Sequence, residues 1–153
     1  MNKKYTIYIA DDHTLFRKAM VNLLETFDSV GEVKDAESGR ELLGMIKQQQ
    51  PDAAIVDLQM PIMDGAETCE QILHKFPDVK IIVLTMHDSD KYVLHMMEMG
   101  VHAFLLKNTE PDELEKAICA VVENDFYHNA WVVAIMRKNL RARRPNFAND
   151  ELT

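Results

Sequence analysis

The sequence is short of the residues that mark several common classes of protein. It has five glycines, two cysteines and one tryptophan, and no apolar stretch approaches the roughly 18 residues of a membrane-spanning helix. No charged and then apolar leader opens it. No glycine lies near Asp11, which follows the first apolar run, so the glycine-rich loop of a flavin or dinucleotide site is missing. We therefore expect a soluble, cytoplasmic protein without membrane contact or a nucleotide cofactor.

Cysteine and positive charge are also scarce. Cys69 and Cys119 fall inside expected helices without a CxxC spacing, which favours buried thiols in a reducing compartment over a disulfide or a metal site. With 17 Lys and Arg against 25 Asp and Glu, the net charge of −8 argues against nonspecific nucleic-acid binding by the whole chain. The six histidines share no metal-ligand spacing, so we expect them at the surface.

What the sequence does have is a regular alternation of short apolar runs and helical patterns. The runs cover residues 5–10, 32–36, 53–57, 80–85 and 101–106. Residues 53–56 and 81–84 are apolar without alternation, as in parallel strands covered on both faces, whereas 32–36 is more polar and suits an edge. Five such units predict an α/β fold, a doubly wound five-stranded parallel sheet of the flavodoxin-like type with right-handed crossovers.

The segments between the runs carry helix start and stop signals. Caps are expected at Ser38, Asp64, Asp88 or Ser89, and Thr109 or Glu110. Ser38 followed by Glu41 forms a capping box, Asp64 is interpreted as a cap rather than a ligand, and Gly65 is assigned to the turn. The apolar face of the first helix, over residues 14–27, would consist of Leu15, Phe16, Ala19, Met20, Leu23 and Leu24.

Polar residues with functional chemistry lie at the ends of four of the apolar runs. Asp11 and Asp12 directly follow the first run, Asp57 is the last residue of the third, Thr85 is the last residue of the fourth, and Lys107 directly follows the fifth. In a parallel sheet the carboxyl ends of the strands meet at one edge, where functional groups collect. Three carboxylates there repel one another and need compensation by a divalent cation with oxygen ligands and by the lysine. The pattern indicates a site that handles a phosphoryl group.

Each of these residues also has a simpler interpretation. Asp11 or Asp12 alone could cap the helix that begins near residue 14, and Lys107 could be a solvated lysine at a strand end. Phe104 could be an ordinary core residue. The cap interpretation loses force when Asp11 and Asp12 are taken together with Asp57, and the solvated interpretation loses force because Lys107 directly follows an apolar run.

Taken in order, the strand-end motifs resemble the response-regulator receiver domain, from about residue 4 to residue 124. The matching segments are Asp11-Asp12-His13, residues 56–65, Leu84-Thr85 and residues 103–107. Within that family, residues 11–13 and 107–108 are most similar to the NarL/FixJ branch, and residues 147–153 are similar to the lead-in to its LuxR-type helix-turn-helix domain. The resemblance implies a receiver domain over 1–124, then a linker helix and tail over 125–153 that lead toward a DNA-binding domain absent from this sequence.

The composition changes beyond residue 124. An amphipathic helix over 129–140 would carry an apolar face made of Trp131, Val132, Ile135 and Met136, which is too large for free solvation. It must pack on the receiver or on a second copy, and we favour a homodimer because the resemblance implies a regulator that reads two DNA half-sites. The basic run over 137–144 is interpreted as a linker, with DNA-backbone contact as the alternative, and 145–153 as a turn-rich end.

The resemblance also implies roles for individual residues. Asp57 would accept a phosphoryl group from a sensor histidine kinase. Asp12 and Asp57 would bind Mg²⁺ together with the backbone carbonyl of Gln59, and Asp11 would act largely through coordinated water. Lys107 would neutralise the phosphoryl oxygens.

A second set of implied roles concerns the response to phosphorylation. Thr85 would offer its hydroxyl to the phosphoryl group, and Phe104 would be an aromatic switch. The expected function is therefore a phosphorylation-activated receiver whose output is transcription, with DNA reached only through the absent domain.

Three other functions compete with this expectation. A freestanding phosphorelay or adaptor receiver would act on a protein target, although such a receiver would normally end near residue 124. A dehalogenase-type phosphatase would need a second carboxylate two residues after Asp57, where Gln59 stands. Flavin or nucleotide binding would need the missing glycine-rich loop. No conventional enzyme activity is expected beyond Mg²⁺-dependent phosphorylation and dephosphorylation of the chain itself.

Overall fold

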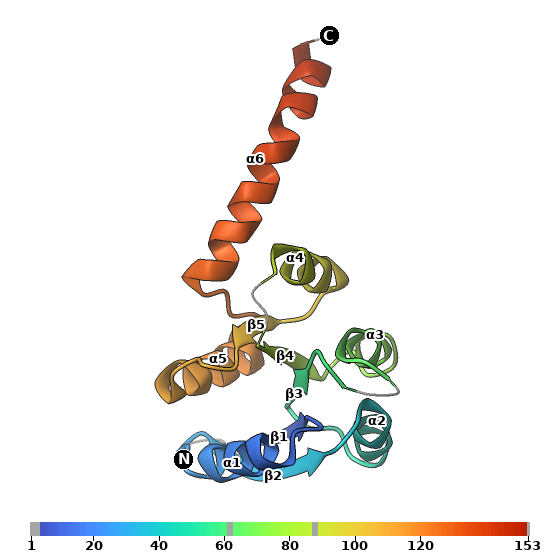
Figure 1. The fold of residues 1–153 in the computed structure, drawn as a ribbon, viewed down its shortest axis with the longest axis vertical. Coiled ribbons are helices and arrows are strands. Elements are labelled where there is room, and N and C mark those ends of the chain that lie inside the picture. Colours follow the sequence, from blue (N-terminus) through green and yellow to red (C-terminus); the bar gives the residue numbers. More distant parts are fainter. Residues whose placement is uncertain (1–3, 61–62, 87–88, 153) are drawn as a thin grey trace.

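The computed structural model describes residues 4–60, 63–86 and 89–152, with side chains up to residue 142 (Figure 1). The strands are β1 (Tyr5–Ala10), β2 (Val30–Ala36), β3 (Ala53–Asp57), β4 (Lys80–Thr85) and β5 (Ala103–Leu106). The helices are α1 (Thr14–Glu25), α2 (Gly39–Gln48), α3 (Gly65–Lys75), α4 (Asp90–Met99), α5 (Pro111–Asn124) and α6 (Ala130–Leu152). Among the described residues, no helix combines the length and the apolar character needed to cross a membrane.

The five strands form one parallel sheet in the order β2-β1-β3-β4-β5, which confirms the predicted doubly wound fold. Helices α1 and α5 cover one face, and α2, α3 and α4 cover the other (Figure 1). Alternate side chains of β1 enter the two cores, Ile7 and Ile9 on the α1 side and Tyr8 and Ala10 on the α2 side, as the two-residue period of a strand requires. The strand order reverses between β1 and β3, so the crevice at their carboxyl ends is the expected place for a site.

The predicted caps at Ser38 and Asp64 are present. Ser38 accepts a hydrogen bond from the Glu41 backbone N–H at 3.2 Å, and Asp64 Oδ1 accepts one from the Glu67 N–H at 2.8 Å. Helix α4 follows Ser89, and the alternative start at Asp88 lies outside the described residues. These caps satisfy backbone N–H groups that have no partner within the helix.

The predicted apolar face of α1 is wrong at Leu15, which is 89% exposed, and at Ala19, which is also exposed. The buried positions of the helix are Arg17, Met20 and Leu24. At about 100° per residue, Leu15 lies roughly 140° around the helix from Met20, so it points away from the sheet. Helix α1 also ends at Glu25, and β2 begins at Val30, two residues earlier than predicted.

Helix α6 is longer than predicted, because it continues through Pro145 to Leu152 instead of ending at Leu140. The predicted turn-rich end is therefore wrong for residues 145–152. A proline removes one N–H donor, whereas most residues around it, including Arg and Ala, are good helix formers. Figure 1 shows α6 extending well away from the sheet beyond its first turns.

The first turns of α6 pack on the sheet domain of the same chain. Val132 and Ile135 are buried in the core on the α4 side, and the half-buried Trp131 ring lies 5.7 Å from the Phe104 ring, centroid to centroid. Asn129 caps the helix by accepting a hydrogen bond from the Val132 N–H at 2.8 Å. The predicted apolar face is therefore covered within the chain, while self-association stays a prediction.

Ile135→Ala is expected to lower the free energy of unfolding by about 2–4 kcal/mol, because it leaves a cavity under α6. Leu140→Ala, at a position that is 65% exposed on the same helix, should change it by less than about 0.5 kcal/mol. Urea denaturation followed by Trp131 fluorescence measures both variants. The emission of the folded parent should not depend on protein concentration, and a concentration-dependent shift would place Trp131 in a contact between copies instead.

Candidate functional site

Three carboxylates and a histidine meet at the crevice between β1 and β3. Single ligand atoms of Asp11, Asp12, His13 and Asp57 all lie within 4.8 Å of one another. Asp11 and Asp57 are almost fully buried, and Asp12 is exposed. The Asp11 backbone N–H donates to the Ala36 carbonyl at 3.1 Å, which fixes the end of β1 against β2. The structure thus brings together the three aspartates that the sequence placed at strand ends.

Lys107 enters the same crevice from the end of β5. Its Nζ lies 2.9 Å from Asp11 Oδ2 and 3.5 Å from Asp57 Oδ2, and 4.5 Å from the centroid of the Phe16 ring. Its backbone N–H donates to the Thr85 carbonyl at 2.8 Å, which sets the position of the lysine relative to β4. Because only 9% of its side chain is exposed, the solvated-lysine interpretation is wrong.

The cap interpretation of Asp11 and Asp12 is also wrong. The N-cap residue of α1 is His13, and no side chain caps that helix. Asp11 Oδ1 instead accepts a hydrogen bond from the His13 backbone N–H at 2.8 Å, while Asp11 Oδ2 faces Lys107. The carboxylate pair therefore faces the crevice rather than the helix terminus.

Asp57 is the most perturbed carboxylate of the cluster. Burial, followed by the charge of Asp11, raises the pKa of Asp57 from 3.8 to about 6. Lys107 and the Gln59 backbone N–H, which donates to Asp57 Oδ1 at 3.3 Å, lower the pKa of Asp57 and so offset part of this rise. No described residue donates a hydrogen bond to Asp57 Oδ2. A buried acceptor left open beside two other carboxylates fits a divalent cation with oxygen ligands.

The raised pKa of Asp57 makes stability depend on pH. The folded carboxyl holds its proton more tightly than the unfolded one, so the bound proton stabilises the folded state. This stabilisation is fully present below about pH 4 and is lost as pH rises through about 6. Without Mg²⁺, the free energy of unfolding of the parent should fall by about 1–3 kcal/mol over this interval relative to Asp57→Asn. Urea denaturation at several pH values measures the difference, and parallel pH profiles would contradict it.

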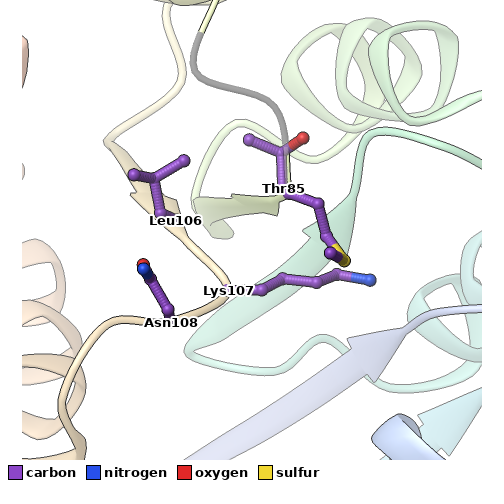
Figure 2. Close-up of a pocket in the computed structure, with 5 residues that line it drawn as sticks. Thr85, Leu106, Lys107 and Asn108 are labelled. Atoms are coloured by element: carbon purple, nitrogen blue, oxygen red, sulfur yellow. The ribbon is translucent and has the colours of Figure 1, made fainter.

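Thr85 borders two cavities at the carboxyl edge of the sheet. One, of about 280 Å³, is lined by Thr85, Met86, Leu106, Lys107 and Asn108. Figure 2 shows Thr85 at one strand end and Lys107 at the next, with the lysine side chain extending across the edge of the sheet. The other, of about 210 Å³, is lined by Leu58, Gln59, Asp64, Ala66, Thr85 and Tyr92. Thr85 itself is fully buried, and it lines both cavities.

Phe104 is buried and packs against Trp131, so in this structure it is a core residue. Its role as a switch stays a prediction. Gln59 contributes its backbone N–H to Asp57, and the role of its carbonyl as a metal ligand also stays a prediction.

Two residues of the site were missed from the sequence. His13, expected at the surface, is 59% exposed, yet its Nδ1 lies 3.0 Å from Asp11 Oδ1. Arg17 is buried, and donates to the Asp11 backbone carbonyl at 2.8 Å and to Asp35 Oδ2 at 2.7 Å. The position of His13 directly after two strand-end aspartates was a usable signal. Arg17 gave none, because arginine on a helix ordinarily faces solvent.

Comparison with known proteins gives consistent matches. Residues 7–119 match the family model described as the response regulator receiver domain. The chain is 32% identical over 138 residues to the transcriptional regulatory protein DegU of Brevibacillus brevis, covering 90% of this chain and 58% of that protein. The receiver domain of NarL from Mycobacterium tuberculosis superposes with a TM-score of 0.75 at 31% identity, covering 80% of this chain and 98% of that one.

A receiver domain solved with a phosphoryl mimic also matches. The isolated receiver domain of RcsB from Salmonella enterica serovar Typhimurium, in the presence of BeF₃⁻, superposes with a TM-score of 0.78 at 26% identity, covering 87% of this chain and 99% of that one. Among full-length curated relatives, the chain spans only about half of the length, between 51% and 58% of the first three.

Proposed function

The chain belongs to the response regulator receiver family, and from that premise we propose that Asp57 accepts a phosphoryl group from the phosphohistidine of a sensor histidine kinase. The observation that carries the proposal is the open, buried Oδ2 of Asp57, with Lys107 Nζ 3.5 Å away. No other described carboxylate combines burial at a strand end with a facing cation and an oxygen that accepts no hydrogen bond.

The transfer needs one bond formed and one broken. Asp57 Oδ2 attacks the phosphorus, the bond from phosphorus to the kinase imidazole nitrogen breaks, and that nitrogen leaves with the electron pair, which gives an acyl phosphate on Asp57. Such transfers depend mainly on positioning and electrostatics. Lys107 supplies a fixed positive charge for the phosphoryl oxygens, and Arg17 holds the Asp11 backbone in place through its carbonyl.

The donor set suits Mg²⁺. Asp12 and Asp57, whose oxygens lie close together, would offer carboxylate ligands. Gln59 would offer its backbone carbonyl, and Asp11 would act through a coordinated water. Once bound, the ion neutralises negative charge on the phosphoryl group. Lys107 Nζ lies 2.9 Å from Asp11 Oδ2, so the lysine is close to one of the carboxylates of this donor set.

The output that we propose is transcription in the cytoplasm. DegU is named a transcriptional regulatory protein, and this chain shares 32% identity with it. In the full-length protein a further domain would contact DNA, and paired receivers would match two half-sites. Helix α6, which leaves the receiver beside α4, is the connection through which the signal would pass.

The direct test treats the chain with acetyl phosphate and Mg²⁺. Intact mass spectrometry should find one added phosphoryl group, which hydroxylamine removes because it is an acyl phosphate. Omitting Mg²⁺ should slow the reaction severely. Size-exclusion chromatography of the same samples reports whether phosphorylation changes self-association. A mass that does not change under any of these conditions would contradict the proposed function.

Thr85→Ala should accept a phosphoryl group but lose the conformational response at α4, β5 and α5. The reason is that the variant has no hydroxyl at this position to bind a phosphoryl oxygen. Thr85→Ser keeps the hydroxyl and should keep the response. Amide-exchange NMR with and without beryllofluoride measures the change at these elements. An unaltered response in Thr85→Ala would show that the hydroxyl does not couple the site to this surface.

A further inference from the structure

His13 presents a ring nitrogen to the carboxylates although most of its side chain is exposed. Its Nδ1 lies 3.0 Å from Asp11 Oδ1, 3.5 Å from Asp12 Oδ1 and 3.9 Å from Asp57 Oδ2. Its backbone N–H donates to Asp11 Oδ1 at 2.8 Å, and its extended backbone, at φ −83° and ψ 97°, precedes the first turn of α1. Its Nδ1 is within hydrogen-bonding distance of Asp11 Oδ1, and its side chain makes no helix-capping hydrogen bond.

Two of these separations, from His13 Nδ1 to Asp12 Oδ1 and to Asp57 Oδ2, fit direct ligands of one cation. In an octahedral site with ligand distances near 2.1 Å, neighbouring ligand atoms lie about 3.0 Å apart and opposite ones about 4.2 Å apart. The distances from His13 Nδ1 to these two oxygens are 3.5 and 3.9 Å, within that interval. In the tautomer that carries its proton on Nε2, the imidazole would present the Nδ1 lone pair to the cluster.

A second observation points to a ligand at the same place. Asp57 Oδ2 is buried and accepts no hydrogen bond from any described residue, and it lies 3.9 Å from His13 Nδ1. Lys107 approaches the cluster at Asp11 Oδ2, whereas His13 lies at Asp11 Oδ1. The lysine and the imidazole therefore contact different oxygens of Asp11, and both lie within 4 Å of Asp57 Oδ2.

We propose that His13 is a nitrogen ligand of the divalent cation in this site, so that the site favours first-row transition ions such as Co²⁺ over Mg²⁺ by more than an all-oxygen site would. Mg²⁺ prefers oxygen ligands, whereas Co²⁺ accepts imidazole nitrogen readily. This inference rests on the proposed function, because it uses the same acidic site. It adds one residue to the ligands and a chemical preference to the site.

The test is calorimetric titration of the 153-residue chain with CoCl₂ and, separately, with MgCl₂. His13→Ala should weaken Co²⁺ binding by about 10-fold or more and Mg²⁺ binding by less than about 2-fold. The visible absorption of bound Co²⁺ should also change, because a nitrogen ligand is lost. His74→Ala removes an exposed histidine on α3 that lies outside the cluster, and should leave both affinities unchanged. His13→Gln, which keeps side-chain length but offers no imidazole, should behave like His13→Ala.

The outcomes separate this inference from the proposed function. If Asp57 is phosphorylated and Mg²⁺ binds, but His13→Ala leaves Co²⁺ affinity and absorption unchanged, then His13 is not a ligand and the proposed function stands. Equal losses for Co²⁺ and Mg²⁺ would also overturn the nitrogen-ligand inference. If neither Mg²⁺ binding nor phosphorylation occurs in the parent, the proposed function fails, whatever Co²⁺ does.

Discussion

Asp57→Asn is expected to abolish phosphoryl incorporation from acetyl phosphate and, without Mg²⁺, to raise the free energy of unfolding at neutral pH by about 1–3 kcal/mol. The amide removes the nucleophile and also a charge that is buried beside Asp11. Loss of function together with a gain in stability is typical of a carboxylate that is kept for chemistry rather than for folding. Intact mass spectrometry and urea denaturation measure the two effects.

Other carboxylates provide controls for this prediction. Asp78→Asn, at an exposed position outside the cluster, should keep both phosphorylation and stability. Asp12→Asn should abolish phosphorylation with equal or higher stability, because it removes a metal ligand from a repulsive cluster. If Asp57→Asn still gained a phosphoryl group at the parent's rate, the acceptor would be elsewhere, and a loss of stability would make Asp57 a structural residue.

Gly65→Ala is expected to lower the free energy of unfolding by about 2–4 kcal/mol, because α3 begins in direct contact with the end of β3. A methyl group at this position would overlap the Asp57 carbonyl oxygen and the Leu58 Cα, both of which are backbone atoms that cannot rotate away. The Gly65 N–H also donates to the Leu58 carbonyl at 2.9 Å. Relief of the overlap must move α3 or the strand end that carries Asp57, so phosphorylation should also slow.

Gly44→Ala is the matched control for this substitution. Gly44 lies inside α2 with open space around it, and alanine there should stabilise the protein by about 0.5–1 kcal/mol. Urea denaturation of both variants, with phosphorylation rates from mass spectrometry, compares them directly. A Gly65→Ala protein as stable as the parent would mean that the contact between α3 and β3 is loose, and that Asp57 is not held by it.

The sequence was sufficient for the fold because its signals are local and repeated. Unbroken apolar runs at β3 and β4 predicted buried parallel strands, and the polar residues after them predicted which side chains would meet. Ser38 and Asp64 marked helix starts through hydrogen bonds made within three residues. Such features depend little on the rest of the protein, and the structure confirms them.

What the sequence could not provide depends on contacts between distant segments. Leu15 was assigned to a buried face from its residue type alone, whereas the sheet selects the face that carries Arg17. Gly65 was assigned to a turn, whereas its requirement comes from close approach to the β3 backbone. Ile135 packs in the core on the α4 side of the same chain. From the sequence alone, a second chain could equally have covered this residue, since an apolar stripe does not identify what covers it.

The central claim, that Asp57 is the phosphoacceptor, is tested most directly by locating the modified residue. After reaction with acetyl phosphate and Mg²⁺, reduction with sodium borohydride converts an aspartyl phosphate to homoserine, which peptide mass spectrometry can place in the sequence. We expect homoserine at Asp57 and at no other position. Homoserine at Asp11 or Asp12 instead, or an added phosphoryl group that borohydride does not convert, would contradict the claim.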